Sequence, residues 1–397
     1  MNIFYKAYCR IFQGVFRLAL PVLPYKDPKI LPRIADIPGE VKARGLKRPL
    51  VVTDTDLYGV GAVAPLMAAL DNAGIEYTVF KDVVFNPTVS TVESALAAYK
   101  AGGCDCLIAF GGGSPMDTAK AVGALVAKPK KPLAKMKGIL KVGKKIPYLI
   151  AVPTTCGTGS ETTLAAVIVD DETRHKYAIN DFPLIPKVAV LDATALDGLP
   201  QKLVAYTGLD ALTHAVEAYI GRSTTKMTRA DATSAVKLVF ENLLGAYEGD
   251  KTARANMLTA AHLAGRAFSK SYVGYVHALA HALGGKYNVP HGFANAVLLP
   301  IVLREYGKSV YKKLAKLARY CGFADKIDTK EAAARKFLEK LDELESALGI
   351  PAGFDCIKAE DIKELSRHAA KEANPLYPVP KLWDAKRLAK VYEMAVI

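Results

Sequence analysis

The chain has 397 residues, of which 51% are hydrophobic, and it carries a formal net charge of +14. This length exceeds one ordinary hydrophobic core, so we expect two domains. Eight lysines between Lys128 and Lys145 supply much of the charge, and no aromatic interleaving or recognisable module accompanies them, so we expect no nucleic-acid partner. The six cysteines are scattered without a disulfide framework or a CxxC pair, which is typical of a cytoplasmic protein.

Residues 1–45 form an extension whose first part has the periodicity of an amphipathic helix. The run from Ile11 to Leu23 is apolar, but Gln13 and Arg17 interrupt it and no small-residue cleavage site follows. It therefore fits neither a signal peptide nor a transmembrane span. We expect the helix to dock on the protein or on a second subunit, with weak membrane association as the alternative. Its apolar face comprises Phe4, Tyr8, Ile11, Phe12, Val15 and Leu18 or Ala19.

From Arg48 onward, short apolar runs alternate with segments of helical periodicity. The pattern predicts a parallel sheet covered by helices on both faces, which is an α/β domain that ends near residue 199. After Pro200 the strand signals stop, so residues 200–397 are expected to form an all-helical second domain. The predicted strands are 49–53, 76–80, 104–110, 147–152 and 187–191, and the predicted helices are 63–73, 91–101 and 115–126.

Three of the seven histidines fall within the segment VHALAHALGGKYNVPHG. His277 and His281 are four residues apart in an Ala/Leu-rich stretch, so both rings lie on one face of a helix. We expect Gly284–Gly285 to end that helix and His291 to project from the turn that follows. Imidazoles from a helix and an adjacent turn can converge on one metal ion.

A second pair of potential ligands, one aspartate and one histidine, lies about sixty residues upstream, in GLDALTHAVEAY. Asp210 and His214 are again four residues apart on a predicted helix. One carboxylate and three neutral imidazoles form a suitable site for a divalent transition metal. His262 and His368 stand alone, and we interpret both as structural or surface residues.

Two loops rich in glycine and hydroxyl groups follow predicted strands. GGGSPMDTAK, residues 111–120, opens the third predicted helix, and PTTCGTGSE, residues 153–161, follows the fourth strand. Both leave the carboxyl ends of parallel strands, where ligands bind in open sheets. Backbone N–H groups at the start of a helix suit a phosphate. The G-x-G-x-x-G spacing is absent, however, and a plain strand-to-helix turn explains the glycines equally well.

In this order, GGGSPMDTAK, PTTCGTGSE, GLDALTHAVEAY and VHALAHALGGKYNVPHG resemble the iron-containing (group III) alcohol dehydrogenase family. The resemblance implies a dehydroquinate synthase-like fold, with a Rossmann-like α/β domain at 1–199 and an all-helical metal-binding domain at 200–397. It also implies an active site in the cleft between them. The metal ligands that it implies are Asp210, His214, His277 and His291.

The same resemblance places His281 beside the nicotinamide rather than on the metal. We therefore predict that His281 is catalytic and passes the released proton to solvent, since imidazole titrates near neutral pH. The cofactor-binding residues that the resemblance implies are Asp54, Asn86, Gly112, Gly113, Ser114, Asp117, Thr154, Thr155, Thr158 and Lys176.

Four further side chains carry specific expectations. Asp54 ends the first strand, where a carboxylate can bind the adenosine ribose and repel a 2′-phosphate, so NAD is expected rather than NADP. Capping of the next turn is the alternative role. Cys156 is expected to be a reactive thiol near the cofactor. Tyr272 or Tyr275 is expected to line the alcohol pocket, unless both pack between helices.

These features predict a cytoplasmic alcohol dehydrogenase or aldehyde reductase that forms a homodimer or a higher homo-oligomer. It would transfer a hydride between NAD(H) and a small primary alcohol or aldehyde, with Fe²⁺ polarising the substrate oxygen. The ligands suit Zn²⁺ equally well. One alternative is a lyase of the dehydroquinate synthase type, which the intact histidine motif disfavours. The other alternative is a non-catalytic metal- or anion-binding protein, which the lysine excess suggests.

Overall fold

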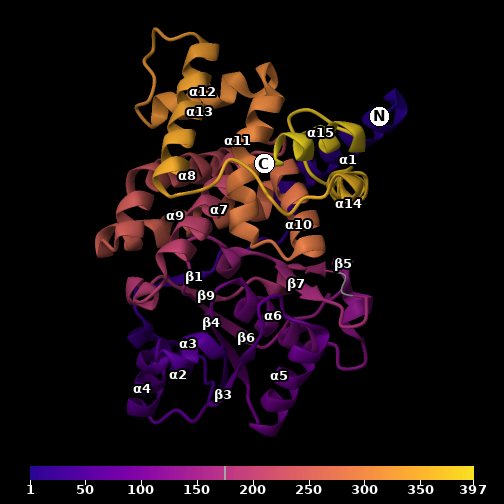
Figure 1. Cartoon of the computed structure of the whole chain (residues 1–397). Helices are drawn as coiled ribbons and strands as arrows, with labels where there is room; N and C mark the ends of the chain where they lie inside the picture. The colour runs from indigo at the N-terminus through magenta and orange to yellow at the C-terminus, as the bar shows by residue number, and fades with distance from the viewer. Residues whose placement is uncertain (174–175) are drawn as a thin grey trace. The chain divides into compact units, whose positions relative to one another are not determined.

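The computed structural model describes residues 1–173 and 176–397, and the chain divides into two compact units. One unit is the α/β segment Pro24–Pro200, and the other joins Met1–Leu23 to the helical segment Gln201–Ile397 (Figure 1). We expected residues 1–45 to be an extension of the α/β domain. The first 23 residues instead pack with the helical unit.

The α/β unit is built on a parallel six-stranded sheet with the order β1-β9-β6-β4-β2-β3. The five predicted strands are all present, which confirms the α/β prediction. A sixth strand, β1, was missed because only three residues form it, and it pairs in parallel with β9 at the edge of the sheet. The strands are β1 (Lys29–Leu31), β2 (Pro49–Asp54), β3 (Thr78–Val83), β4 (Cys106–Gly111), β6 (Tyr148–Pro153) and β9 (Val188–Val190).

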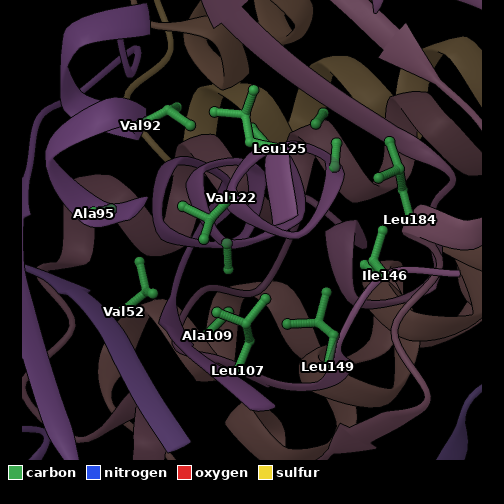
Figure 2. Close-up of a cluster of buried hydrophobic side chains, with 14 of the residues drawn as sticks. Val52, Val92, Ala95, Leu107, Ala109, Val122, Leu125, Ile146, Leu149 and Leu184 are labelled. Atoms are coloured by element: carbon green, nitrogen blue, oxygen red, sulfur yellow. The ribbon is translucent and has the colours of Figure 1, made fainter. Parts of the chain in front are cut away.

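Alternate residues of the central strands enter two separate cores, one on each face of the sheet. In β4, Leu107 and Ala109 join one hydrophobic cluster, whereas Ile108 and Phe110 join the other. This follows from the two-residue period of a strand, and it explains why the strands are continuous apolar runs. Figure 2 shows the first cluster, where Leu107 and Ala109 lie beneath Val122 of helix α6. The helices of this unit are α2 (Ile37–Ala43), α3 (Thr55–Gly59), α4 (Ala64–Asn72), α5 (Val89–Ala101) and α6 (Gly113–Ala127).

A second, three-stranded sheet was not predicted. Its order is β5-β8-β7, with β5 at Gly138–Ile139, β8 at Lys176–Asn180 and β7 at Ala165–Val169. The strands β7 and β8 are antiparallel. Strand β5 lies within the lysine-rich stretch, where polar residues leave no apolar run that would predict a strand. Most of the lysines in that stretch are exposed, as expected.

The segment after Pro200 is helical, as predicted. In the described part of residues 201–397, the structure contains nine α-helices and no strand apart from an isolated bridge between Phe354 and Val396. No helix among the described residues is long and apolar enough to cross a membrane. The helices are α7 (Gln201–Ile220), α8 (Lys226–Glu248), α9 (Lys251–Ser271), α10 (Tyr275–Tyr287), α11 (His291–Tyr306), α12 (Lys308–Tyr320), α13 (Lys330–Ala347), α14 (Ile362–Ala373) and α15 (Ala385–Met394).

The predicted N-terminal helix is present as α1 (Ile3–Ala19), but it docks through the face opposite to the expected one. The apolar face points outward: Phe4 is 82% exposed and Leu18 is 81% exposed. The buried residues are Cys9 and Gln13, and Gln13 is only 4% exposed. Periodicity located the helix correctly, and α1 packs on this chain through the opposite face because polar groups of Gln13 find buried partners there. Docking of the apolar face on a second subunit or on a membrane stays a prediction.

Candidate functional site

Four potential metal ligands converge inside the helical unit. Asp210 and His214 come from successive turns of α7, His277 from the first turn of α10, and His291 from the first residue of α11. One ligand atom from each of the four lies within 4.8 Å of all the others. Asp210 Oδ1 is 3.5 Å from His291 Nε2, 3.6 Å from His277 Nε2 and 3.9 Å from His214 Nδ1.

One local expectation about this site was wrong. The helix that carries His277 does not end at Gly284–Gly285; α10 continues to Tyr287 and ends at Asn288, which has a left-handed backbone with φ 56°. Glycine inside a helix costs only about 1 kcal/mol, whereas asparagine is well suited to a left-handed C-terminal position. His291 therefore begins the next helix instead of projecting from a turn.

The arrangement fits a divalent metal ion. Two ligand atoms bound at about 2.1 Å in tetrahedral geometry lie about 3.4 Å apart, close to the separations of Asp210 Oδ1 from His277 and His291. His277 Nε2 is buried and makes no hydrogen bond to any of the residues that the structure describes. An enclosed imidazole nitrogen with no hydrogen-bond partner is unfavourable unless a ligand such as a metal ion occupies its lone pair.

The electrostatics of the cluster also favour a cation. Burial alone would raise the pKa of Asp210, but His214, His291 and His277 overcome this effect and hold the pKa well below its usual range. Burial alone would lower the pKa of His277, yet the nearby carboxylates of Asp210 and Glu217 raise it to about 9. The negative potential that attracts a proton to this imidazole also attracts a metal ion.

Glu217 supports the site without being a ligand, and sequence reasoning missed it. Its carboxylate lies 2.6 Å from His277 Nδ1 and accepts hydrogen bonds from Gly274 N at 2.7 Å and Val276 N at 2.8 Å. A Cβ at Gly274 would lie 2.6 Å from Glu217 Oε1, so only glycine permits this approach. Such a carboxylate fixes the tautomer of a ligating histidine, so that Nε2 faces the metal. The spacing of His214 and Glu217 on one helix face was the available signal.

Asn295 is a second supporting residue that was missed. It lies one helical turn after His291, and its Nδ2 donates to Asp210 Oδ1 at 2.7 Å. The same nitrogen lies 3.2 Å from His291 Nε2. Asn295 therefore orients the carboxylate and connects it to α11.

His281, the predicted catalytic residue, is placed beside the cluster but outside it. Its ring stacks on that of His291 with a centroid separation of 5.1 Å, and the metal cluster does not include it. Its Nδ1 is 2.7 Å from Glu372 Oε1, and Tyr377 donates its hydroxyl to the same oxygen at 2.7 Å. Burial alone would raise the pKa of Glu372, but His281 lowers it, so the carboxylate stays charged. No local pattern indicates this pairing, because Glu372 lies 91 residues away from His281.

Of the two tyrosines expected near the substrate, Tyr275 belongs to the core. It is fully buried, its ring stacks on Trp383 at 5.1 Å, and its hydroxyl donates to Asn374 Oδ1 and Trp383 O at 3.0 Å. The expectation of a pocket role for Tyr275 is therefore wrong. Tyr272 contacts the ring of Phe16 from α1 at 5.0 Å and lies 6.4 Å from the ring of Tyr377.

The α/β unit brings the two predicted cofactor loops together at the ends of adjacent strands, β4 and β6. Thr154 N donates to Gly111 O at 3.2 Å, and a Cβ at Gly112 would lie 3.0 Å from Thr155 Cγ2. The Thr155 hydroxyl is enclosed and has no hydrogen-bond partner within residues 1–173 and 176–397. Gly112 precedes α6, and Gly113 and Ser114 form its first turn, where free N–H groups suit a phosphate. A phosphate-bearing cofactor fits this cradle.

Lys120 also belongs to GGGSPMDTAK, and the sequence alone suggested no role for it. In the structure it hydrogen-bonds to the end of the second loop and to the residues that follow. Its buried Nζ donates to Ser160 O, Ser160 Oγ, Thr163 Oγ1 and Ala165 O at 2.7 to 2.9 Å. Burial lowers the pKa of Lys120 to about 8. Asp117 accepts from Val167 N at 3.1 Å, and burial raises its pKa to about 6. The observed partners of Asp117 are thus protein groups that support the loop.

Four of the predicted cofactor residues have defined local contacts. Asp54 begins α3 as its N-cap, with Leu57 N donating to Oδ1 at 2.8 Å, which is the alternative role considered for it. Asn86 has a left-handed backbone, and Lys176 Nζ donates to its Oδ1 at 2.9 Å. Cys156 is fully buried, so its thiol does not have the accessibility expected of a reactive cysteine. Thr158, a predicted cofactor residue of the second loop, accepts a hydrogen bond from Ser160 N at 3.4 Å.

Comparisons with known proteins agree with this fold. A family model described as iron-containing alcohol dehydrogenase matches residues 32–193, and the C-terminal model of the same family matches residues 204–396. Lactaldehyde reductase from Escherichia coli K12 is 39% identical over 333 residues, which are 83% of this chain and 87% of that protein. The 1,3-propanediol dehydrogenase from Citrobacter freundii is 36% identical over 372 residues, covering 92% and 95% of the two chains.

Solved structures show the same similarity. A crystal structure of a 1,3-propanediol oxidoreductase superposes with a TM-score of 0.90 at 35% identity and covers 94% of this chain and 99% of that chain. The sulfoacetaldehyde reductase from Bifidobacterium kashiwanohense in complex with NAD⁺ gives a TM-score of 0.83 at 27% identity, with 94% and 98% coverage. The two models together match most of the sequence, and we conclude that the chain belongs to the iron-containing alcohol dehydrogenase family.

Proposed function

We propose that this chain interconverts a small primary alcohol and its aldehyde, with NAD(H) as the hydride carrier, at a metal centre. The observation that carries the proposal is the set of one carboxylate and three imidazoles, of which all but His291 are buried, in a chain of this family. Relatives named lactaldehyde reductase and 1,3-propanediol dehydrogenase support a small oxygenated substrate.

Asp210, His214, His277 and His291 are the residues to which we assign Fe²⁺, and the same four would accept Zn²⁺. When bound, the ion would supply Lewis-acid polarisation of the substrate oxygen, and the nicotinamide would exchange the hydride. Because only one of the four ligands is charged, the site would retain a net positive charge. Glu217 and Asn295 keep His277 and Asp210 oriented for this task.

His281 is the residue to which we assign proton transfer. Its Nδ1 is engaged by Glu372, so Nε2 is the ring nitrogen that remains to accept a proton from the alcohol or return one to the aldehyde. The side chain is one third exposed, which allows exchange of that proton with solvent. Glu372 holds the ring orientation through its contact with Nδ1.

For the cofactor, we assign the pyrophosphate to Gly112, Gly113 and Ser114, with the hydroxyls of Thr154, Thr155 and Thr158 nearby. The support is the contact between the two loops and the unused hydroxyl of Thr155. Asn86 and Lys176, which hydrogen-bond to each other, are assigned to the same cofactor, and Asp117 to the support of its loop. Asp54 would select NAD over NADP through its charge, in addition to capping α3.

The experiment that tests the proposal is an NADH-oxidation screen over short aldehydes, with the protein reconstituted separately with Fe²⁺ and with Zn²⁺. We expect steady NADH consumption with at least one short hydroxyaldehyde and with at least one of the two metals. A metal-loaded protein that consumes no NADH with any aldehyde would refute the proposal. Retention of bound cofactor and metal without turnover on any alcohol or aldehyde would instead favour a non-catalytic binding protein.

A further inference from the structure

Helix α1 precedes residue 32, at which the family match begins, so the family comparison assigns it no role. It is nevertheless tied to the helical unit by specific polar contacts. Gln13 Nε2 donates to Pro375 O at 3.1 Å and to Tyr377 O at 2.8 Å. Arg10 donates from Nη1 to Val379 O at 2.8 Å and from Nη2 to Pro380 O at 3.1 Å.

The recipient of these bonds is the segment 375–380, with the sequence PLYPVP. Its three prolines have no N–H group, so the segment cannot form a helix or a regular strand pairing of its own. Within the segment only Tyr377 O accepts an internal bond, from Val379 N at 2.8 Å, and Pro378 O accepts from Arg222 N at 2.7 Å. The carbonyls of Pro375, Val379 and Pro380 take their donors from α1, and a buried carbonyl without a partner is unfavourable. Arg10 Nη1 also donates to Gln13 Oε1 at 2.8 Å, which fixes the two side chains relative to each other.

A short chain of hydrogen bonds leads from this segment to His281. Tyr377, whose carbonyl accepts from Gln13, donates its hydroxyl to Glu372 Oε1 at 2.7 Å. The same oxygen lies 2.7 Å from His281 Nδ1. A second contact joins α1 to the same region. Phe16 of α1 packs edge-on against Tyr272, and the ring of Tyr272 lies next to that of Tyr377.

We propose that α1, through Arg10 and Gln13, is a positioning element that holds the segment 375–380 so that Tyr377 and Glu372 fix the ring of His281. The inference rests on the proposed function, because it concerns the residue assigned to proton transfer. Arg10 and Gln13 do not contact the metal ligands through any bond described above. They therefore affect turnover and not metal binding.

The test compares Gln13→Leu, which removes the two donors at similar size, with Ile11→Ser, a control on the exposed face of the same helix. For Gln13→Leu we expect kcat to fall about tenfold, since small misplacements of catalytic groups are costly. The KM for NADH and the metal content should stay at native values. Amide hydrogen exchange within residues 372–380 should accelerate in Gln13→Leu and not in Ile11→Ser.

Tyr377→Phe separates positioning from general destabilisation, because it removes only the hydroxyl that holds Glu372. We expect a similar fall in kcat with native exchange in residues 375–380. Native kcat in both Gln13→Leu and Tyr377→Phe would overturn the inference, as would loss of metal in Gln13→Leu. If the native protein reduces no aldehyde, the proposed function fails; unchanged exchange in Gln13→Leu would then overturn the positioning role by itself.

Discussion

Replacement of Glu217 with glutamine should weaken metal binding although this residue is not a ligand. The native carboxylate faces three donors: His277 Nδ1, Gly274 N and Val276 N. A glutamine side chain offers one carbonyl oxygen and one NH₂ group, so at least one of these donors would face another donor. Hydrogen bonds to charged groups contribute about 1.5–3 kcal/mol each. Loss of one such bond corresponds to a decrease in metal affinity of about 10- to 100-fold, the range observed for residues that support metal ligands.

The assay is competition for Fe²⁺ or Zn²⁺ against a chelator of known affinity, with circular dichroism of the metal-free protein as a check of folding. Glu345→Gln is the matched control, because Glu345 is also a buried carboxylate of the helical unit and belongs to α13. We expect the control to bind metal as the native protein does. Affinity of Glu217→Gln within twofold of the native value would refute the assignment of Glu217.

Three further outcomes are expected. Asp54→Asn should retain the cap of α3 but lose the charge, so the ratio of kcat/KM for NADH to that for NADPH should fall about tenfold, or 1.4 kcal/mol; an unchanged ratio would remove Asp54 from cofactor selection. Lys120→Met should remove the donor that Ser160, Thr163 and Ala165 share, lowering the free energy of unfolding by about 3 kcal/mol and weakening NADH binding; a native melting temperature would contradict this. Burial raises the pKa of Glu345 well above its ordinary value, so the folded state binds a proton more tightly than the unfolded state and native stability falls as pH rises above about 4.5. Glu345→Gln should therefore melt at a higher temperature than the native protein at pH 7.5, with a smaller difference at pH 4.5, as thermal unfolding at the two pH values would show.

Local periodicity predicted the parts of this molecule that depend on neighbours in the chain. The four-residue spacings of Asp210 with His214 and of His277 with His281 each place two side chains on one helix face. The apolar runs of the central sheet were recognised because both of its faces are buried. Strand β1 was too short to give a periodic signal and is defined by its pairing with β9.

The supporting contacts of the site could not be predicted because they join residues distant in sequence. Glu372 lies 91 residues from His281, and neither carries a local pattern that indicates the other. The face through which α1 packs on this chain could not be predicted for a related reason: Gln13 is buried because it donates to the carbonyls of Pro375 and Tyr377, more than 360 residues away. In both cases the position of a polar side chain is determined by hydrogen bonds between distant parts of the chain. A hydrophobic pattern carries no information about such bonds.

The central claim is that Asp210, His214, His277 and His291 form one metal site and that His281 stands outside it. The most direct measurement is the metal-to-protein ratio of the native protein, His277→Ala and His281→Ala after identical reconstitution with Fe²⁺ or Zn²⁺. We expect a ratio close to one for the native protein and for His281→Ala, and a ratio close to zero for His277→Ala. Full metal content in His277→Ala, or loss of metal in His281→Ala, would contradict the assignment.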